Sequence, residues 1–265
     1  MSDILSKIVA TKREEVAAQQ KALSFEALVD EAKRFGEQQK TRGFMAALQA
    51  KIEARQTAII AEVKKASPSK GVIRADFDAV AIAKAYEQAG ATCLSVLTDE
   101  LYFQGKPEYL QMIREQSALP LLRKDFVIDP YQIVQSRLWG ADAILLIVAI
   151  LNDDELLSYT ELAQQWGLDV LVEVHDEEEC ERALKLPVSV IGVNNRNLRN
   201  FSISLETSIR LKQQMPEGYQ VICESGIERY EDVLTMQQAG IYGFLVGSSL
   251  MASPDVGKAL RQLMG

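Results

Sequence analysis

The sequence contains very little histidine and cysteine. Its single histidine, His175, argues against a Ser-His-Asp triad and against a multi-histidine metal site. Its three cysteines, Cys93, Cys180 and Cys223, are odd in number and lack CxxC spacing, so neither a disulfide framework nor a zinc site is expected. We expect a reducing, cytoplasmic setting, no metal site, and chemistry that depends on Lys, Glu, Asn, Arg and Ser.

Long apolar runs and an excess of positive charge are also missing. No stretch of roughly 18 apolar residues occurs, and the N-terminal segment MSDILSKIVATKREEVAAQQ is charged too early for a signal peptide. The net charge is -8, with 29 basic and 37 acidic residues. We therefore expect no membrane partner and no nucleic-acid partner, and any anionic ligand must be bound by local groups.

What the sequence does contain is a repeated alternation of short apolar runs and amphipathic stretches over 265 residues. This alternation is typical of βα units in a parallel sheet, and one α/β barrel needs about 250 residues. The predicted strands are 57–63, 93–98, 119–124, 143–149, 169–174, 190–194, 220–225 and 243–247. We predict an α/β protein with a single domain, 1–265, folded as a (β/α)8 TIM barrel.

Helical patterns lie between these runs and before the first of them. The clearest span 77–88, 131–139, 153–166 and 230–239, and Gly90, Gly140, Gly167 and Gly240 are the expected helix stops. Residues 4–20 and 25–35 read as two further amphipathic helices. We expect residues 1–50 to form an N-terminal helical cap or lid on the barrel.

Charged residues stand at the carboxyl ends of three predicted strands, where barrel enzymes place their active sites. Glu62 and Lys64 end the first strand, and their period-two spacing turns both side chains inward. Lys124 ends the third strand after an apolar run, where desolvation is expected to lower its pKa. Glu173 ends the fifth strand, where desolvation is expected to raise its pKa and suit it to proton transfer.

Polar residues follow the last three strands as well. Asn194 and Arg196 follow the sixth and supply amide groups and a guanidinium that suits a carboxylate. The seventh is followed by Glu224, Ser225 and Gly226 and the eighth by Gly247 and Ser248, a pattern typical of barrel phosphate sites. Any one of these residues is more often a rim ion pair or a turn, but their convergence on one end favours a site for a small phosphorylated substrate.

The motifs that carry these residues are specific. EVKKASPSKG, LLRKDF, LVEVH, GVNNRNL, CESGI and FLVGSSLM together resemble the indole-3-glycerol phosphate synthase family of tryptophan biosynthesis. The resemblance implies ring closure of 1-(2-carboxyphenylamino)-1-deoxyribulose 5-phosphate with loss of carbon dioxide and water. It implies no cofactor and no metal.

The resemblance also implies catalytic roles. Lys124 is expected to be the general acid that protonates the substrate carbonyl oxygen, and Glu173 the partner for proton transfer in the dehydration. Glu62 and Asn194 resemble residues that hydrogen-bond the sugar hydroxyls and the leaving oxygen. Lys64 resembles a residue that bridges the phosphate and the reacting end, and its use as the dehydration acid stays open.

The remaining roles concern binding. Arg196, held by Glu224, is expected to face the substrate carboxylate, and Ser67 and Phe126 to line the pocket. The phosphate is expected to bind at Ser225, Gly226, Gly247 and Ser248. Asn197 departs from the family pattern, in which aspartate follows Asn-Asn-Arg, and so does Lys106, where serine is commoner.

Other functions stay open at this point. A neighbouring sugar-phosphate barrel, either a ketol isomerase of the same pathway or a Schiff-base aldolase using Lys124, would place similar residues at the strand ends. A barrel that only binds phosphorylated metabolites would do so too. Because the chain ends soon after the eighth predicted strand, we expect no fused second barrel.

Overall fold

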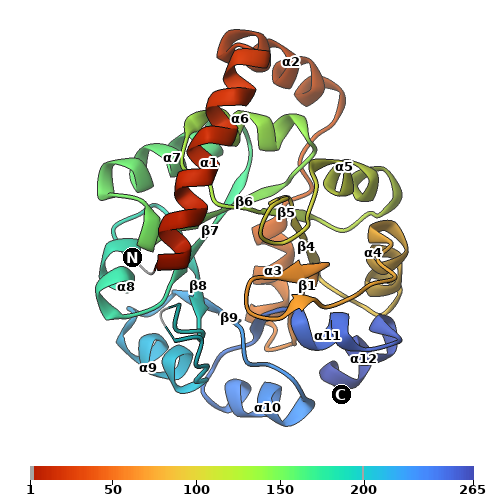
Figure 1. The fold of residues 1–265 in the computed structure, drawn as a ribbon. Helices are drawn as coiled ribbons and strands as arrows, with labels where there is room; N and C mark the ends of the chain where they lie inside the picture. The colour runs from red at the N-terminus through yellow and green to blue at the C-terminus, as the bar shows by residue number, and fades with distance from the viewer. Residues whose placement is uncertain (1–2, 199) are drawn as a thin grey trace.

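A closed barrel of parallel strands forms the centre of the molecule (Figure 1). The computed structural model describes residues 3–198 and 200–265, and within them the barrel has eight strands. β1 pairs with both β4 and β10, which closes the sheet. The strands are β1 (Ala58–Val63), β4 (Cys93–Leu97), β5 (Leu121–Lys124), β6 (Ala143–Ile147), β7 (Asp169–Val174), β8 (Val190–Asn194), β9 (Gln220–Glu224) and β10 (Gly243–Val246). The predicted (β/α)8 TIM barrel is confirmed.

Six of the eight strands differ at one end from the prediction, and β1, β4 and β10 do so by a single residue. β5 begins at Leu121 rather than at residue 119, because Pro120 has no N–H to give to the sheet. β6 ends at Ile147, where a 3₁₀ turn, η1 (Val148–Ile150), begins. β9 ends at Glu224, because Ser225 has a φ of 63° in the left-handed region, which no strand contains.

Helices surround the barrel (Figure 1). The outer helices are α4 (Ala79–Gln88), α5 (Pro107–Gln116), α6 (Pro130–Leu138), α7 (Asp153–Gln165), α8 (Glu177–Ala183), α9 (Glu206–Gln214), α10 (Tyr230–Gln238) and α12 (Val256–Met264). A hairpin of β2 (Ala66–Ser67) and β3 (Gly71–Val72) follows β1, and the short helix α11 (Ser248–Ala252) follows β10. Several helices begin at an aspartate that accepts N–H groups of the first turn, namely Asp78, Asp129, Asp176 and Asp255. The expected helix stops at Gly90, Gly140, Gly167 and Gly240 all have positive φ.

The segment before β1 forms α1 (Asp3–Ala22), α2 (Phe25–Gln38) and α3 (Phe44–Glu53). α1 runs across the barrel face seen in Figure 1, and α2 packs on α6. The sequence interpretation missed α3, although its buried Phe44, Leu48 and Ile52 recur every four residues. These side chains pack against the inward residues of the barrel, so α3 closes the end opposite the cavity described below.

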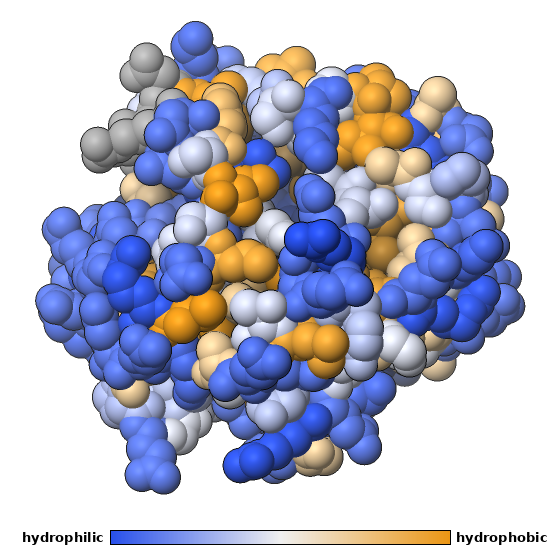
Figure 2. Space-filling model, turned by 90° about the horizontal axis from the view of Figure 1, so that it is seen from below, coloured by the Kyte–Doolittle hydropathy of each residue, from blue (hydrophilic) through white to orange (hydrophobic). Residues whose placement is uncertain are grey.

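Two apolar cores result from the alternation of side chains along each strand. One set packs between the strands and the outer helices, and the other fills the barrel interior above α3. The face in Figure 2 is largely hydrophilic, with separate small hydrophobic areas. Among the described residues, no helix is long and apolar enough to cross a membrane.

Candidate active site

One cavity opens at the carboxyl ends of the barrel strands, and all of the predicted site residues line it. They are Glu62, Lys64, Ser67, Lys124, Phe126, Glu173, Asn194, Arg196, Glu224, Ser225, Gly226, Gly247 and Ser248. The inward alternation explains the convergence. Glu62, Lys124 and Glu173 each stand two residues beyond an apolar side chain of the barrel interior, so they continue the same inward face at the mouth.

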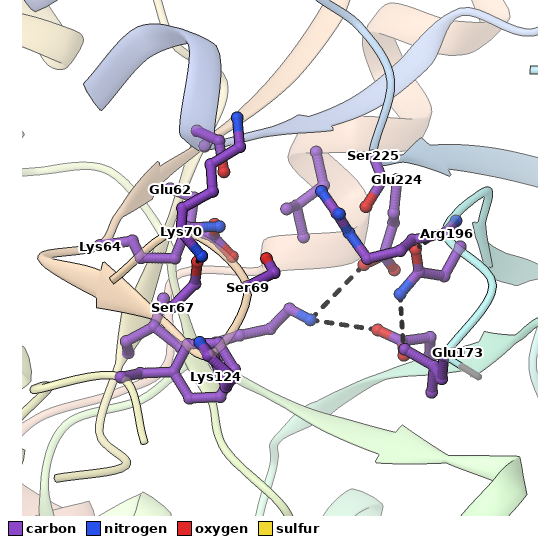
Figure 3. A pocket seen from close by; sticks show the side chains of 18 of the residues that line it. Glu62, Lys64, Ser67, Ser69, Lys70, Lys124, Glu173, Arg196, Glu224 and Ser225 are labelled. Atoms are coloured by element: carbon purple, nitrogen blue, oxygen red, sulfur yellow. Dashed lines mark hydrogen bonds and ion pairs between the residues drawn. The ribbon is translucent and has the colours of Figure 1, made fainter. Parts of the chain in front are cut away.

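Lys124 lies at the centre of the cavity between two carboxylates (Figure 3). Its Nζ is 3.1 Å from Glu173 Oε2 and 3.5 Å from Glu224 Oε2. Burial by itself lowers the pKa of Lys124, but the charges of Glu173, Glu224 and Glu62 outweigh burial and raise the pKa above its ordinary value. The expectation of a lowered lysine pKa was therefore wrong, because β7 and β9, which do not neighbour β5 in the barrel, supply carboxylates from across the cavity.

Glu173 is held as a carboxylate. Besides Lys124, its Oε1 is 3.3 Å from His175 Nε2 and accepts a hydrogen bond from Asn194 Nδ2 at 3.3 Å. Burial raises the pKa of Glu173, but Lys124 and His175 outweigh burial and hold the pKa well below the ordinary value. The expected raised pKa of Glu173 was wrong for that reason.

His175 takes a larger part than the sequence indicated. Burial lowers its pKa, but hydrogen bonds and charges from Glu173 and Glu179 prevail and raise the pKa to about 10. Its Nδ1 is 2.9 Å from Glu179 Oε2, which fixes the ring. A cationic imidazole therefore stands directly against Glu173 at neutral pH.

The carboxyl group with a raised pKa is Glu224. Burial raises the pKa first, Lys124 lowers it, and the nearby Glu173 and Glu62 raise it further, so that it reaches about 8. A buried pair of carboxyls beside one lysine thus favours one proton on Glu224. Its side chain passes against Gly192 on β8, where any Cβ would collide with Glu224 Oε1.

The expected pairing of Glu224 with Arg196 was wrong. Glu224 turns inward to Lys124, and within the described residues the Arg196 guanidinium forms no ion pair. Arg196 is positioned through its backbone instead. Its N–H donates to Asn194 Oδ1 at 3.1 Å, and its backbone bridges to Ile203. The guanidinium is left available at the cavity wall for an anion.

Glu62 and Lys64 form an ion pair at the end of β1. Gly247 lies beside this pair, and a Cβ at Gly247 would collide with Glu62 Oε2. The glycine at the end of β10 therefore leaves room for the Glu62 side chain as well as for a ligand. Elsewhere on the cavity wall, the rings of Phe126 and Phe103 form a tilted pair with centroids 6.0 Å apart.

Backbone N–H groups gather at the ends of β9 and β10. Ser225 and Gly226 have φ values of 63° and 95°, and a Cβ on Gly226 would meet Ile203 Cγ2 at 2.8 Å. The first bond of α11 runs from Met251 N to Gly247 O, so the N–H groups of Ser248 and its next neighbour precede the helical ladder. Such groups are suited to a phosphate.

Asn195 holds this corner together, and the sequence interpretation missed it. Its Nδ2 donates to the carbonyl oxygens of Glu224 and Ser225 at 3.1 and 3.0 Å. Its Oδ1 accepts from the Ser208 backbone and hydroxyl at 3.0 and 2.9 Å. The only sequence signal for Asn195 was its position directly after Asn194. Because side chains alternate along a strand, the residue after an inward-facing one points away from the cavity and can support the neighbouring backbone.

Sequence comparisons match nearly the whole length of the chain to one family of known proteins. The family model described as indole-3-glycerol phosphate synthase matches residues 5–263. The chain belongs to the indole-3-glycerol phosphate synthase family. Curated proteins of that name from Acidovorax sp. (strain JS42) and Leptothrix cholodnii (strain ATCC 51168 / LMG 8142 / SP-6) are 51% identical over 267 residues and 50% identical over 263 residues, each covering 99% of both chains.

Solved structures of low sequence identity share the fold. KGPDC from Streptococcus mutans aligns with a TM-score of 0.61 at 11% identity, covering 78% of this chain and 95% of that one. A mutant tryptophan synthase alpha-subunit from Pyrococcus furiosus aligns with a TM-score of 0.60 at 13% identity, covering 78% and 98%. These two show the barrel alone. Membership of the indole-3-glycerol phosphate synthase family decides the activity: this chain is a decarboxylating carbon–carbon lyase of tryptophan biosynthesis.

Proposed function

We propose that this cavity closes the pyrrole ring of 1-(2-carboxyphenylamino)-1-deoxyribulose 5-phosphate, with Lys124 as the general acid. The observation that carries the proposal is the position of the Lys124 ammonium, buried between Glu173 and Glu224 at the centre of the cavity. An ammonium whose pKa is raised is fully protonated at neutral pH and can meet a developing alkoxide. We place the reaction in the cytoplasm, with this small phosphorylated substrate as the partner of the site.

In the first step the ring carbon that bears the carboxylate attacks the carbonyl carbon. The new C–C bond pushes the carbonyl electron pair onto oxygen, and Lys124 gives that oxygen its proton. Carbon dioxide then leaves, and its bonding electrons restore the aromatic ring. Arg196 faces the carboxylate before it departs, because a guanidinium matches its planar geometry.

In the second step the new hydroxyl leaves as water and a proton leaves the neighbouring carbon. Glu173 takes part as the proton-transfer partner, since Lys124, His175 and Asn194 hold it ionised. Glu224, whose pKa of about 8 keeps a proton on it at neutral pH, stands within reach of the same lysine. It can restore the proton that Lys124 gives away.

The other residues bind and orient the substrate. Glu62 and Asn194 hydrogen-bond the sugar hydroxyls and the leaving oxygen, and Lys64 spans the reacting end and the phosphate, where it can also act as the dehydration acid. The phosphate lies on the N–H groups at Ser225, Gly226, Gly247 and Ser248. Ser67 and Phe126 complete the wall around the substrate.

The direct test follows the fluorescence of the indole product with the carboxyphenylamino substrate and purified protein. Turnover is expected, with release of one carbon dioxide for each indole formed. Borohydride added with substrate is expected to trap no covalent adduct, because this route forms no imine on Lys124. A trapped adduct, or binding without turnover, would contradict the proposal.

Glu173→Gln is expected to lower kcat by about 10²–10⁴ with little change in KM. The amide keeps the shape of the side chain but cannot exchange a proton. Steady-state kinetics measure the split, and Glu178→Gln on the exposed side of α8 is the matched control. A change confined to KM would make Glu173 a binding residue.

Activity is expected to persist in a chelator. One histidine in the sequence and the absence of a ligand motif led to this expectation. The initial rate is measured before and after dialysis against EDTA and is expected to change less than about twofold, because no proposed step uses a metal. Loss of the rate, with recovery on adding a divalent ion, would overturn it.

A further inference from the structure

Lys12 of α1 is a buried lysine that the proposed chemistry does not use. Its side chain is 4% exposed, and its Nζ lies 2.6 Å from Glu15 Oε2, 3.1 Å from Asp99 Oδ2 and 3.1 Å from Asp125 Oδ1. Glu15 belongs to the same helix, but Asp99 follows β4 and Asp125 follows β5. The ammonium therefore joins α1 to two strand ends at the mouth of the cavity.

The α1 end of this junction carries part of the cavity wall. Ile4, Leu5 and Ile8 line the cavity, and Ile4, Ile8 and Lys12 stand four residues apart on one helix face. A second contact, between Thr11 Oγ1 and the Tyr102 hydroxyl at 2.9 Å, ties the same turn of α1 to the loop after β4. α1 is thus attached to the barrel one turn away from its cavity-lining side chains.

The Asp99 end shapes the loop that carries Phe103. Asp99 Oδ1 accepts hydrogen bonds from the N–H groups of Tyr102 and Phe103 at 2.8 and 3.2 Å, and its other oxygen faces Lys12. Phe103 also lines the cavity. The same carboxylate therefore fixes a wall residue with one oxygen and receives α1 with the other.

The Asp125 end sits next to Lys124. Asp125 Oδ1 accepts from Phe126 N at 2.8 Å and contacts Lys12, while its Oδ2 accepts from Thr98 Oγ1 at 2.6 Å and from Arg123 at 2.9 Å. Burial raises the pKa of Asp125, but Lys12 and Arg123 outweigh burial and hold the pKa well below its usual range. Asp125 is therefore a carboxylate, and Lys12 meets a full charge.

We propose that Lys12 is a positioning residue that assembles the apolar wall of the substrate pocket. Its three carboxylate contacts bring together α1, the loop that carries Phe103, and Phe126 at the end of β5. The Phe103 and Phe126 rings face one cavity with the α1 side chains, which is a wall suited to an aromatic ring. The inference rests on the proposed function, because the aromatic ring is that of the anthranilate part of the substrate.

The other partners of Asp99 and Asp125 predict which part of the pocket is disturbed when the charge of Lys12 is removed. Without Lys12, Asp125 still pairs with Arg123 and Thr98, and Asp99 still accepts two backbone N–H groups. The barrel is therefore expected to fold, whereas α1 loses its charged attachment. The aromatic end of the pocket should loosen while the phosphate corner, which lies at the ends of β9 and β10 and does not contact Lys12, keeps its geometry.

The test compares Lys12→Met with Lys7→Met, which removes an exposed lysine from the same helix. Lys12→Met is expected to raise KM at least about tenfold while kcat falls less, because charged hydrogen bonds are lost from a positioning group rather than from the reacting atoms. Two inhibitors separate the ends of the pocket. The inhibition constant of an N-alkyl anthranilate should rise with KM, and that of inorganic phosphate should stay unchanged; Lys7→Met should alter neither.

A folded Lys12→Met enzyme with wild-type KM would overturn the inference, and so would equal weakening of both inhibitors. Should Lys12→Met not fold, Asp99→Asn takes its place, since it keeps the hydrogen-bond acceptor for the loop but removes the charge that α1 meets. An unchanged KM in that variant would overturn the inference too. The wild-type assay keeps the two proposals apart: no wild-type turnover counts against the function, and turnover with unaffected variants counts against Lys12.

Discussion

Lys124→Met is expected to lower kcat by about 10²–10⁴, the usual contribution of a positioned general acid. Methionine fills the space of the lysine stem but cannot give a proton to the forming alkoxide. The ammonium is the only group that touches both Glu173 and Glu224 among the ion pairs of the described residues, so no neighbour replaces it. Substrate binding should suffer less than turnover, because the two anionic ends of the substrate meet other residues.

The fold is expected to survive Lys124→Met, although removal of one partner from a buried pair is often destabilising. Glu173 keeps His175 and Asn194 as partners, and the raised pKa of Glu224 already lets it hold a proton at neutral pH. Circular dichroism and thermal unfolding measure the fold, and Lys106→Met at an exposed position is the matched control. A Lys124→Met enzyme with near wild-type kcat would remove Lys124 from the mechanism.

A substrate without its phosphate is expected to react with kcat/KM lower by at least about 10³. Hydrogen bonds to a charged group contribute about 1.5–3 kcal/mol each, and two or three lost together give on the order of 4–6 kcal/mol. That range corresponds to roughly 10³–10⁴ at a factor of ten for each 1.4 kcal/mol. The N–H groups at Gly226 and Ser248 and the Lys64 ammonium would be left without their anion. Added salt is expected to restore nothing, because salt screens charges but does not replace the direct hydrogen bonds that the phosphate makes.

A variant tests the same corner from the protein side. Gly247→Asp is expected to cause a similar loss, but its side chain would collide with Glu62, so a second variant is needed to isolate the phosphate effect. Ser248→Asp puts a carboxylate at the start of α11, and Ala252→Asp puts the same charge at its exposed far end. Of these last two variants, only Ser248→Asp should lower kcat/KM strongly. If kcat/KM for the dephosphorylated compound lies within about tenfold of that for the natural substrate, the glycines after β9 and β10 only form turns and do not bind phosphate.

The barrel and the membership of its cavity were predictable from the sequence. Strands with β-branched residues alternate inward and outward with a period of two, and a parallel barrel brings every carboxyl end to one rim. Glu62, Lys124 and Glu173 could therefore be assigned to one cavity from the sequence, since each continues an inward row. The helix stops were predictable for an equally local reason, because glycine alone enters the left-handed region at low cost.

The tertiary structure alone decided how the cavity residues are charged and paired. Apolar neighbours in the sequence indicate that a charged group is desolvated. At Lys124 and Glu173, however, charges on other strands outweighed the effect of desolvation on the pKa, and among these three cavity residues desolvation prevailed only at Glu224. The partner of Glu224, the junction at Lys12 and the closure of the barrel by α3 likewise depend on residues far apart in the chain. Coulomb interactions depend on distance in space, and the fold sets that distance.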